Sequence, residues 1–193
     1  MTLTRILFAT AILFTLQACA LSPQMVELKP TADVTTRNLG NNKPIIVSGT
    51  DQRDAEAFGT RGGIYGNTSL IRPANDVTQG IISATQKGLQ SQGFNAYTPV
   101  EGATTIDVRL KELSYVPEKG SVVNSVEVKA IIEAAARNAA GDEYIGTYRA
   151  GNVYQQPLTP SAERNETMIN EVLNRALNQM LIDPKLLNFA AAQ

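Results

Sequence analysis

Two residue counts limit the chemistry open to this chain. Its 193 residues include no histidine and a single cysteine, Cys19. Without histidine, Ser-His-Asp and Cys-His catalysis are excluded, as is a histidine general base that titrates near pH 7. Zinc lacks the nitrogen and sulfur ligands that it prefers. We therefore expect no catalytic residue, no metal site and no cofactor.

Carboxylates are the remaining candidates for catalysis. Asp51, Asp54 and Glu56 follow the first apolar run after the N-terminal region, near the place where an α/β sheet often holds its site. A pair of such carboxyls could serve glycoside hydrolysis, and a group of them could bind calcium. A solvated polar loop is the alternative, and it is the favoured interpretation.

The triplet Asp51, Gln52 and Arg53 is the most notable polar cluster in this segment. It has two interpretations. The three side chains could form a contact surface for a partner, or Arg53 could pair with Asp51 in a buried ion pair that fixes the loop to the sheet. The structural interpretation is favoured.

A glycine-rich segment, residues 59–66, resembles a phosphate-binding loop only in composition. It contains neither G-x-G-x-x-G nor G-K-[ST], so a flexible loop or hairpin is the prediction.

The apolar periodicity predicts six elements in the order β-α-β-β-β-α. Alternating apolar residues indicate strands, and a 3.6-residue apolar repeat indicates helices. The helices are expected near residues 77–92 and 161–181, and the strands near residues 45–47, 106–115, 122–136 and 144–154. This order predicts an α/β (α+β) two-layer sandwich: a mixed, mostly antiparallel sheet with two helices on one face.

Two details of the predicted strands bear on function. The apolar phase slips by one residue at Lys111-Glu112, which is typical of a β-bulge. Tyr144, Tyr148 and Tyr154 share one face of the last strand. They are either the edge of the core or an exposed aromatic strip for a partner.

The N-terminus has the features of a secretory signal. Arg5 precedes an apolar run from Ile6 to Leu16, and small Ala18 stands at the expected cleavage point. Eleven residues are too few to span a bilayer. We therefore expect a signal peptide at 1–18, a lipidated N-terminus and flexible tether at 19–43, and one periplasmic domain at 44–193. Residues 25–28 alternate in polarity and are either part of this tether or a short edge strand.

Leu16-Gln17-Ala18-Cys19 resembles the lipobox of bacterial lipoproteins. The resemblance implies that the Cys19 thiol is alkylated with diacylglycerol, that the signal is cleaved before it, and that its amine is acylated. An ordinary secretory signal with an incidental cysteine is the alternative. Because Ala20, rather than aspartate, follows the cysteine, the family's sorting rule implies the outer membrane, on its periplasmic face.

The whole chain is similar to the YajG family of bacterial lipoproteins. The similarity is carried by the lipobox, by Asp51-Gln52-Arg53, by the long alternating strand, and by Thr147 to Tyr154 before a C-terminal helix. It implies a location and a fold, since no biochemical role is established for that family.

We expect a non-enzymatic binding or scaffold domain, held at the outer membrane through acyl chains on Cys19 and contacting an unknown envelope protein or glycan. The alternatives are a carrier of a small ligand or lipid and, third, a carboxylate-based enzyme acting on envelope glycans. Loss of Arg5 with the signal leaves 16 basic and 18 acidic residues, so nucleic acid is not an expected partner.

Overall fold

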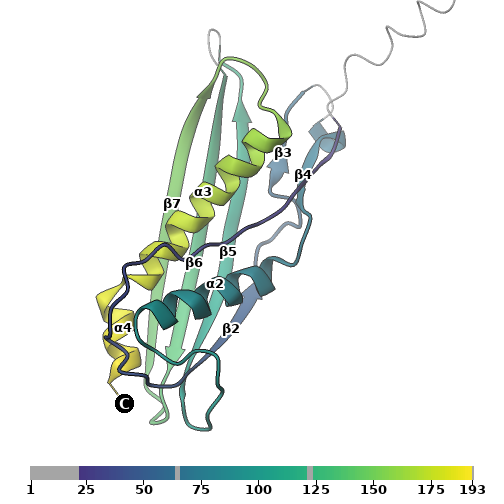
Figure 1. The fold of residues 1–193 in the computed structure, drawn as a ribbon. Helices are drawn as coiled ribbons and strands as arrows, with labels where there is room; N and C mark the ends of the chain where they lie inside the picture. Colours follow the sequence, from purple (N-terminus) through teal and green to yellow (C-terminus); the bar gives the residue numbers. More distant parts are fainter. Residues whose placement is uncertain (1–21, 64–65, 121–123, 193) are drawn as a thin grey trace, which may run out of the picture.

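The computed structural model describes residues 22–63, 66–120 and 124–192. In these residues a mixed seven-stranded sheet carries three helices on one face (Figure 1). The strands are β1 (Gln24–Val26), β2 (Ile45–Asp51), β3 (Gly59–Thr60), β4 (Leu70–Pro73), β5 (Thr104–Glu118), β6 (Asn124–Arg137) and β7 (Glu143–Gln156). The helices are α2 (Val77–Ser91), α3 (Ala162–Leu181) and α4 (Pro184–Ala191), with a short 3-10 turn at Gly66–Thr68. The predicted α+β sandwich is confirmed, and β1, β3, β4 and α4 are added to the six expected elements.

The strands β5, β6 and β7 form the predicted antiparallel meander. Alternate residues of β6 are buried, because one face of the sheet meets the helices and the other meets water. The pairing of β5 with β6 shifts register between Leu110 and Glu112, so the predicted bulge is present. The bulge keeps both Leu110 and Leu113 on the core face.

Two short strands share the other edge of β5. β2 runs parallel to its first half, as far as the pair Asp51–Leu110, and β3 pairs with it at Tyr115. Between them the chain leaves the sheet over residues 53–57 and returns where the backbone N–H of Tyr115 donates to the carbonyl of Phe58 at 2.7 Å. The acidic segment considered above is therefore an excursion beside the β-bulge.

The close approach of β3 to β5 requires glycine at position 59. A Cβ added there would lie 1.9 Å from the carbonyl oxygen of Tyr115. Gly59→Ala should lower the free energy of unfolding by about 1–3 kcal/mol, because β3 must move away from β5. Urea unfolding measures this loss. The control, Gly151→Ala on β7, meets its nearest atom at 3.6 Å and should change stability by less than about 0.5 kcal/mol. Equal losses of unfolding free energy in the two variants would contradict the requirement for glycine at position 59.

The helices begin and end where their capping residues predict. The side chain of Asp76 accepts from the backbone N–H of Gln79 at the start of α2, and Ser161 accepts from Arg164 at the start of α3. Gly93 follows α2 with φ 90°. The apolar stripe of α3 is completely buried against β6 and β7 and comprises Met168, Ile169, Val172, Leu173, Ala176, Leu177, Met180 and Leu181.

The described part of the predicted tether is ordered, so the expectation of a flexible chain up to residue 43 is wrong there. Of the two alternatives for residues 25–28, the strand is correct, since β1 pairs in parallel with β4. Residues 27–37, which we call the strap, then run beside α2 and α3 (Figure 1). The strap and α3 also leave no room for a side chain larger than glycine at Gly88 of α2. A Cβ there would meet Leu181 of α3 and, at 3.1 Å, Ala32 of the strap.

Candidate functional site

Cys19 lies outside the residues that the structure describes, but covalent geometry limits where it can be. Ser22, the first described residue, follows it by three positions. A chain advances at most about 3.6 Å per residue, so the two Cα atoms are no more than about 11 Å apart. Whatever is attached to Cys19 is therefore close to the start of β1.

The chain after Ser22 is tied into the core by a buried polar chain. The hydroxyl of Tyr115 donates to Asn165 Oδ1 at 2.6 Å, and the amide of Asn165 donates to Gln24 Oε1 at 2.8 Å. Gln24 Nε2 donates in turn to the carbonyl of Ala162 at 2.7 Å. Burial raises the pKa of Tyr115 to about 12, so its hydroxyl remains a donor at neutral pH. This network joins β1 to β5 and α3.

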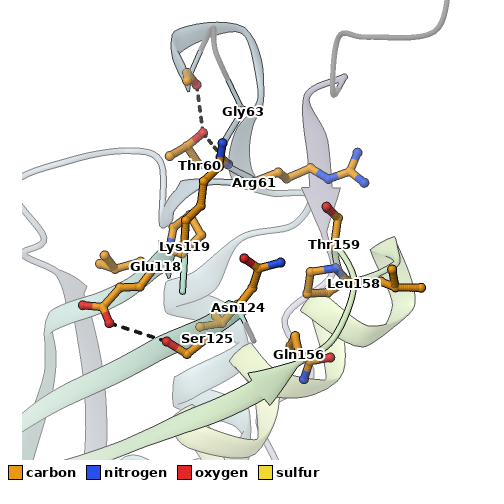
Figure 2. Close-up of a pocket in the computed structure, with 16 residues that line it drawn as sticks. Thr60, Arg61, Gly63, Glu118, Lys119, Asn124, Ser125, Gln156, Leu158 and Thr159 are labelled. Carbon is orange, nitrogen blue, oxygen red and sulfur yellow. Dashed lines mark hydrogen bonds between the residues drawn. The ribbon is translucent and has the colours of Figure 1, made fainter. Parts of the chain in front are cut away.

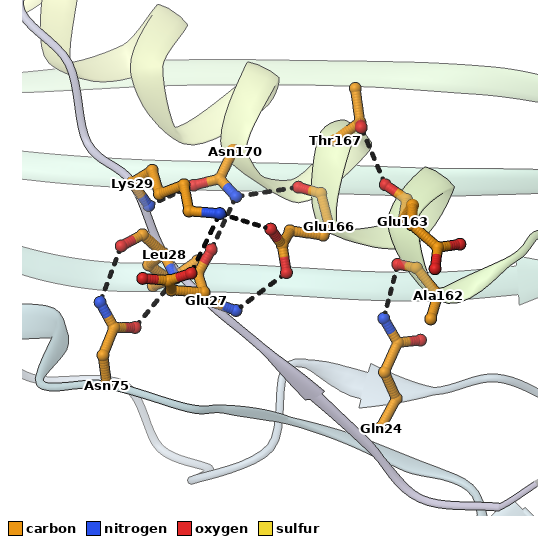
Figure 3. Close-up of polar contacts among 10 residues, drawn as sticks. All are labelled: Gln24, Glu27, Leu28, Lys29, Asn75, Ala162, Glu163, Glu166, Thr167 and Asn170. Atoms are coloured by element: carbon orange, nitrogen blue, oxygen red, sulfur yellow. Dashed lines mark hydrogen bonds and ion pairs between the residues drawn. The ribbon is translucent and has the colours of Figure 1, made fainter.

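The strap is held along α3 by a ladder of side chains (Figure 3). Backbone N–H groups of alternate strap residues donate to side-chain oxygens at every fourth position of the helix, with N···O distances of 2.6–3.2 Å. The pairs are Glu27–Glu166, Lys29–Asn170, Thr31–Asn174 and Asp33–Asn178. Two residues of extended chain advance about 6–7 Å and four residues of helix about 6 Å, so the two spacings match. We call these four α3 positions the ladder.

Further contacts fix the start of the strap. Asn75 accepts from the N–H of Leu28 and donates to its carbonyl, at 2.9 and 2.8 Å (Figure 3). Lys29 Nζ lies 3.0 Å from both Glu27 and Glu166. The hydrogen bond from Lys29 lowers the pKa of Glu166. These exposed ion pairs add little stability, and the ladder supplies most of the polar attachment.

Arg53 and Asp51 form a two-pronged ion pair. Arg53 Nε and Nη2 lie 2.9 and 2.7 Å from the two Asp51 oxygens, and the Arg53 guanidinium stacks 4.9 Å from the centre of the Phe58 ring. The Arg53 side chain is only 6% exposed. Gln52 accepts from Lys111 at 2.8 Å. The geometry is that of a pair that fixes the excursion to the sheet, which is the favoured interpretation of the two.

The acidic segment does not form an enclosed carboxylate pair. Asp51 is engaged by Arg53, and Asp54 and Glu56 are exposed at an open hollow of about 470 Å³. The acid of a glycosidase lies in an enclosed pocket, whereas Asp54 and Glu56 are open to solvent. Within the described residues, no three or more acidic side chains are placed to hold a metal ion.

The tyrosines of β7 belong to the edge of the core. The hydroxyls of Tyr144 and Tyr148 both donate to Asp183 Oδ2 at 2.7 Å, and Tyr154 is buried beside Arg164. Burial and the hydrogen bond to Asp183 raise the pKa of Tyr148. Burial opposes ionisation of Asp183, but the hydrogen bonds from Tyr148 and Tyr144 outweigh it and lower its pKa. The aromatic strip is therefore not an exposed surface.

The lowered pKa of Asp183 predicts a pH-dependent effect. Its ionised form stabilises the fold above the pKa of the unfolded chain, near 4, and this contribution is lost as pH falls. Asp183→Asn should be about 1–2 kcal/mol less stable than wild type at pH 7, because a charged acceptor of two hydroxyls is removed. In urea titrations the difference in unfolding free energy between wild type and Asp183→Asn should become smaller as pH falls from 5 to 3. A difference that stays constant over that range would contradict the assignment.

Residues 60–63 and Gly66 form one wall of a pocket at the end of the sheet (Figure 2). This hollow, which we call the end pocket, has a volume of about 600 Å³ and lies between β3, the adjoining ends of β5 and β6, and residues 156–160. Thr60 and Ser69 hold its wall together through hydroxyls 2.7 Å apart. Arg61 and Lys119 line the pocket with the exposed apolar residues Val116 and Leu158. No sequence motif had indicated this pocket.

The space between the helices and the sheet is filled by the core. Every residue in the apolar stripe of α3 is fully buried, as are the facing residues Val128, Ala130 and Ile132 of β6. A carrier of a lipid or small ligand needs an apolar cavity in this layer. None of the helices in residues 22–63, 66–120 and 124–192 is both long and apolar enough to cross a bilayer.

One family of known proteins is matched by most of the chain. The model of a family described as uncharacterized lipoprotein matches residues 30–190. No curated protein matches the chain. Uncharacterized lipoprotein B from Nitrosomonas europaea is similar, with 13% identity and a TM-score of 0.44, over 89% of this chain and 93% of that one. A minor lipoprotein from Acinetobacter baumannii is similar with 10% identity and a TM-score of 0.44, over 73% of this chain and 91% of that one.

Proposed function

Since the chain belongs to this family of uncharacterized lipoproteins, we propose that it is a lipid-anchored binding or scaffold protein without enzymatic activity. In this proposal Cys19 carries the acyl chains, the anchor lies in the outer membrane, and the domain faces the periplasm. Its similarity to the YajG family supports the same location. Its partner is an envelope protein or glycan.

The ordered strap is the observation that carries the proposal. Its ladder and the buried Gln24–Asn165 contact attach the chain to the domain from residue 24 onward, five residues after Cys19. A long flexible tether would leave the domain free to search the periplasm. The short connection instead supports a domain held close to the membrane in a restricted orientation, as suits a scaffold.

The open face of the sheet supplies the surface for a partner. The helices cover only one face (Figure 1). On the other, Arg109 lies 2.7 Å from Asp107 and 3.0 Å from Glu133, and polar residues alternate along the strands. A polar, rigid surface of this kind fits recognition of a polar envelope component.

The Cys19→Ala variant tests the anchor. The variant should remain as an uncleaved precursor and should incorporate no labelled fatty acid, because the thiol that is alkylated is absent. Wild-type protein should need detergent for its release from washed outer membranes, and the variant should not be found in that detergent-released fraction. Two acyl signals are needed for stable anchoring, so loss of the cysteine removes the attachment. Fatty-acid labelling that persisted in the variant would contradict this assignment.

Photo-crosslinking in intact cells tests the binding role. A photoreactive residue at Arg149, exposed on the open face of β7, should capture a defined envelope protein or glycan. The matched position is Asn188, exposed on α4 on the helical side. Capture from Arg149 and not from Asn188 supports recognition by the open face. No capture from either position would contradict the scaffold role.

A further inference from the structure

The end pocket is next to the place where the chain leads to the membrane anchor. Arg61 lines the pocket, and its Nη1 donates to the carbonyl of Ser22 at 3.2 Å. Because Cys19 is within about 11 Å of Ser22, acyl chains on Cys19 bring this end of the domain to the bilayer surface. This step rests on the proposed lipidation of Cys19.

The residues at this end suit a membrane surface. Leu158 is 77% exposed and Val116 46% exposed, and both line the end pocket. The cations Arg61 and Lys119 and the acid Glu118 all line the end pocket (Figure 2). Lys119 is exposed, and Arg61 Nε is buried without a hydrogen-bond partner within the described residues. Exposed apolar side chains with adjacent cations are the combination that binds lipid interfaces.

The opposite end of the sheet carries charges of both signs. Its turns, which precede β5 and join β6 to β7, carry Glu101 and Asp142 on exposed positions. Lys185 lies on α4 at the same end, and Arg137 pairs there with Glu143. The orientation therefore follows from the position of the anchor and from the residues of the end pocket, and not from a charge difference between the two ends.

We propose that the end pocket rests on the bilayer that holds the anchor. Leu158 and Val116 lie in the lipid interface, and Arg61 and Lys119 contact lipid phosphates. The long axis of the sheet then points away from the membrane, so that the β6–β7 turn and α4 are the parts farthest from it.

Depth-dependent fluorescence quenching tests this orientation. The mature lipoprotein is placed in vesicles of phosphatidylethanolamine and phosphatidylglycerol, 3:1, that contain brominated lipid. With Cys19 acylated, Leu158→Cys supplies the one free thiol for a fluorophore. The matched control is Ile182→Cys, 56% exposed at the far end of α3. Quenching at position 158 should be at least twofold greater than at position 182. Equal quenching at both positions would overturn the proposal.

Charge variants test the role of the cations. Lys119→Glu should reduce quenching at position 158 by about half in these vesicles, whereas Lys185→Glu, the same change on exposed α4, should leave it unchanged. Equal effects of the two variants would contradict a specific phosphate contact. The fold of each variant is checked by its urea midpoint.

Failure of this inference is distinguishable from failure of the lipid anchor. A lipoprotein that floats with vesicles but shows no quenching at position 158 overturns the orientation and leaves the anchor intact. A wild-type protein that carries no fatty acid overturns the anchor. Absence of quenching in vesicles, together with a protein crosslinked at position 158 in cells, would assign the end pocket to a protein partner and overturn the membrane contact.

Discussion

Asn165→Ala should lower the free energy of unfolding by about 3 kcal/mol. The side chain is buried and serves two partners, accepting from the hydroxyl of Tyr115 and donating to Gln24. Its removal leaves a buried donor and a buried acceptor without partners, and each costs about 1–3 kcal/mol. Because Gln24 keeps only its hydrogen bond to the carbonyl of Ala162, β1 should detach before the rest of the sheet unfolds.

Urea unfolding and limited proteolysis measure the two consequences. The urea midpoint should fall with an unchanged slope, and a protease should cleave first within residues 22–30. Gln179→Ala, exposed on the same helix, is the matched control and should change stability by less than about 0.5 kcal/mol. A loss below about 1 kcal/mol in Asn165→Ala, with no new cleavage, would show that the buried chain does not hold β1.

Replacing the three asparagines of the ladder should release the strap. In the variant with Asn170, Asn174 and Asn178 all changed to alanine, four hydrogen bonds to the strap backbone are lost. At about 1 kcal/mol each, the free energy of opening the strap should fall by about 4 kcal/mol. Alanine is the better helix former by up to about 0.7 kcal/mol per residue, which offsets about 2 kcal/mol of the global loss.

The strap should therefore open far more readily while the whole domain loses only about 2 kcal/mol. Amide hydrogen exchange measures the first quantity and urea unfolding the second. The control replaces Glu171, Arg175 and Gln179, which have the same spacing on the exposed face of α3, with alanine. Faster exchange in both variants, or in neither, would contradict the ladder.

Periodicity predicted the parts of the fold in which neighbours in sequence determine structure. The meander and the bulge at Lys111 both follow from local patterns. The pairing of Asp51 with Arg53 was also foreseen, because the two residues are two positions apart at the end of a strand.

The strap could not be predicted in the same way. Its hydrogen bonds join residues about 140 positions apart, and its own sequence has no strong apolar repeat. A signal was present in α3, where asparagine recurs at positions 170, 174 and 178. This residue is unfavourable within a helix unless its side chain has a partner. The end pocket could not be predicted either, because it is formed by segments that meet only in the folded sheet.

The chain is fixed to the domain from residue 24 onward. Residue-resolved hydrogen exchange on the mature lipoprotein tests this most directly. The amides of Lys29, Thr31 and Asp33 should exchange at least 100-fold more slowly than in an unstructured chain, because each donates to the ladder. Exchange of these three amides at the unstructured rate, with the amides of β6 still protected, would show a flexible tether and contradict the claim.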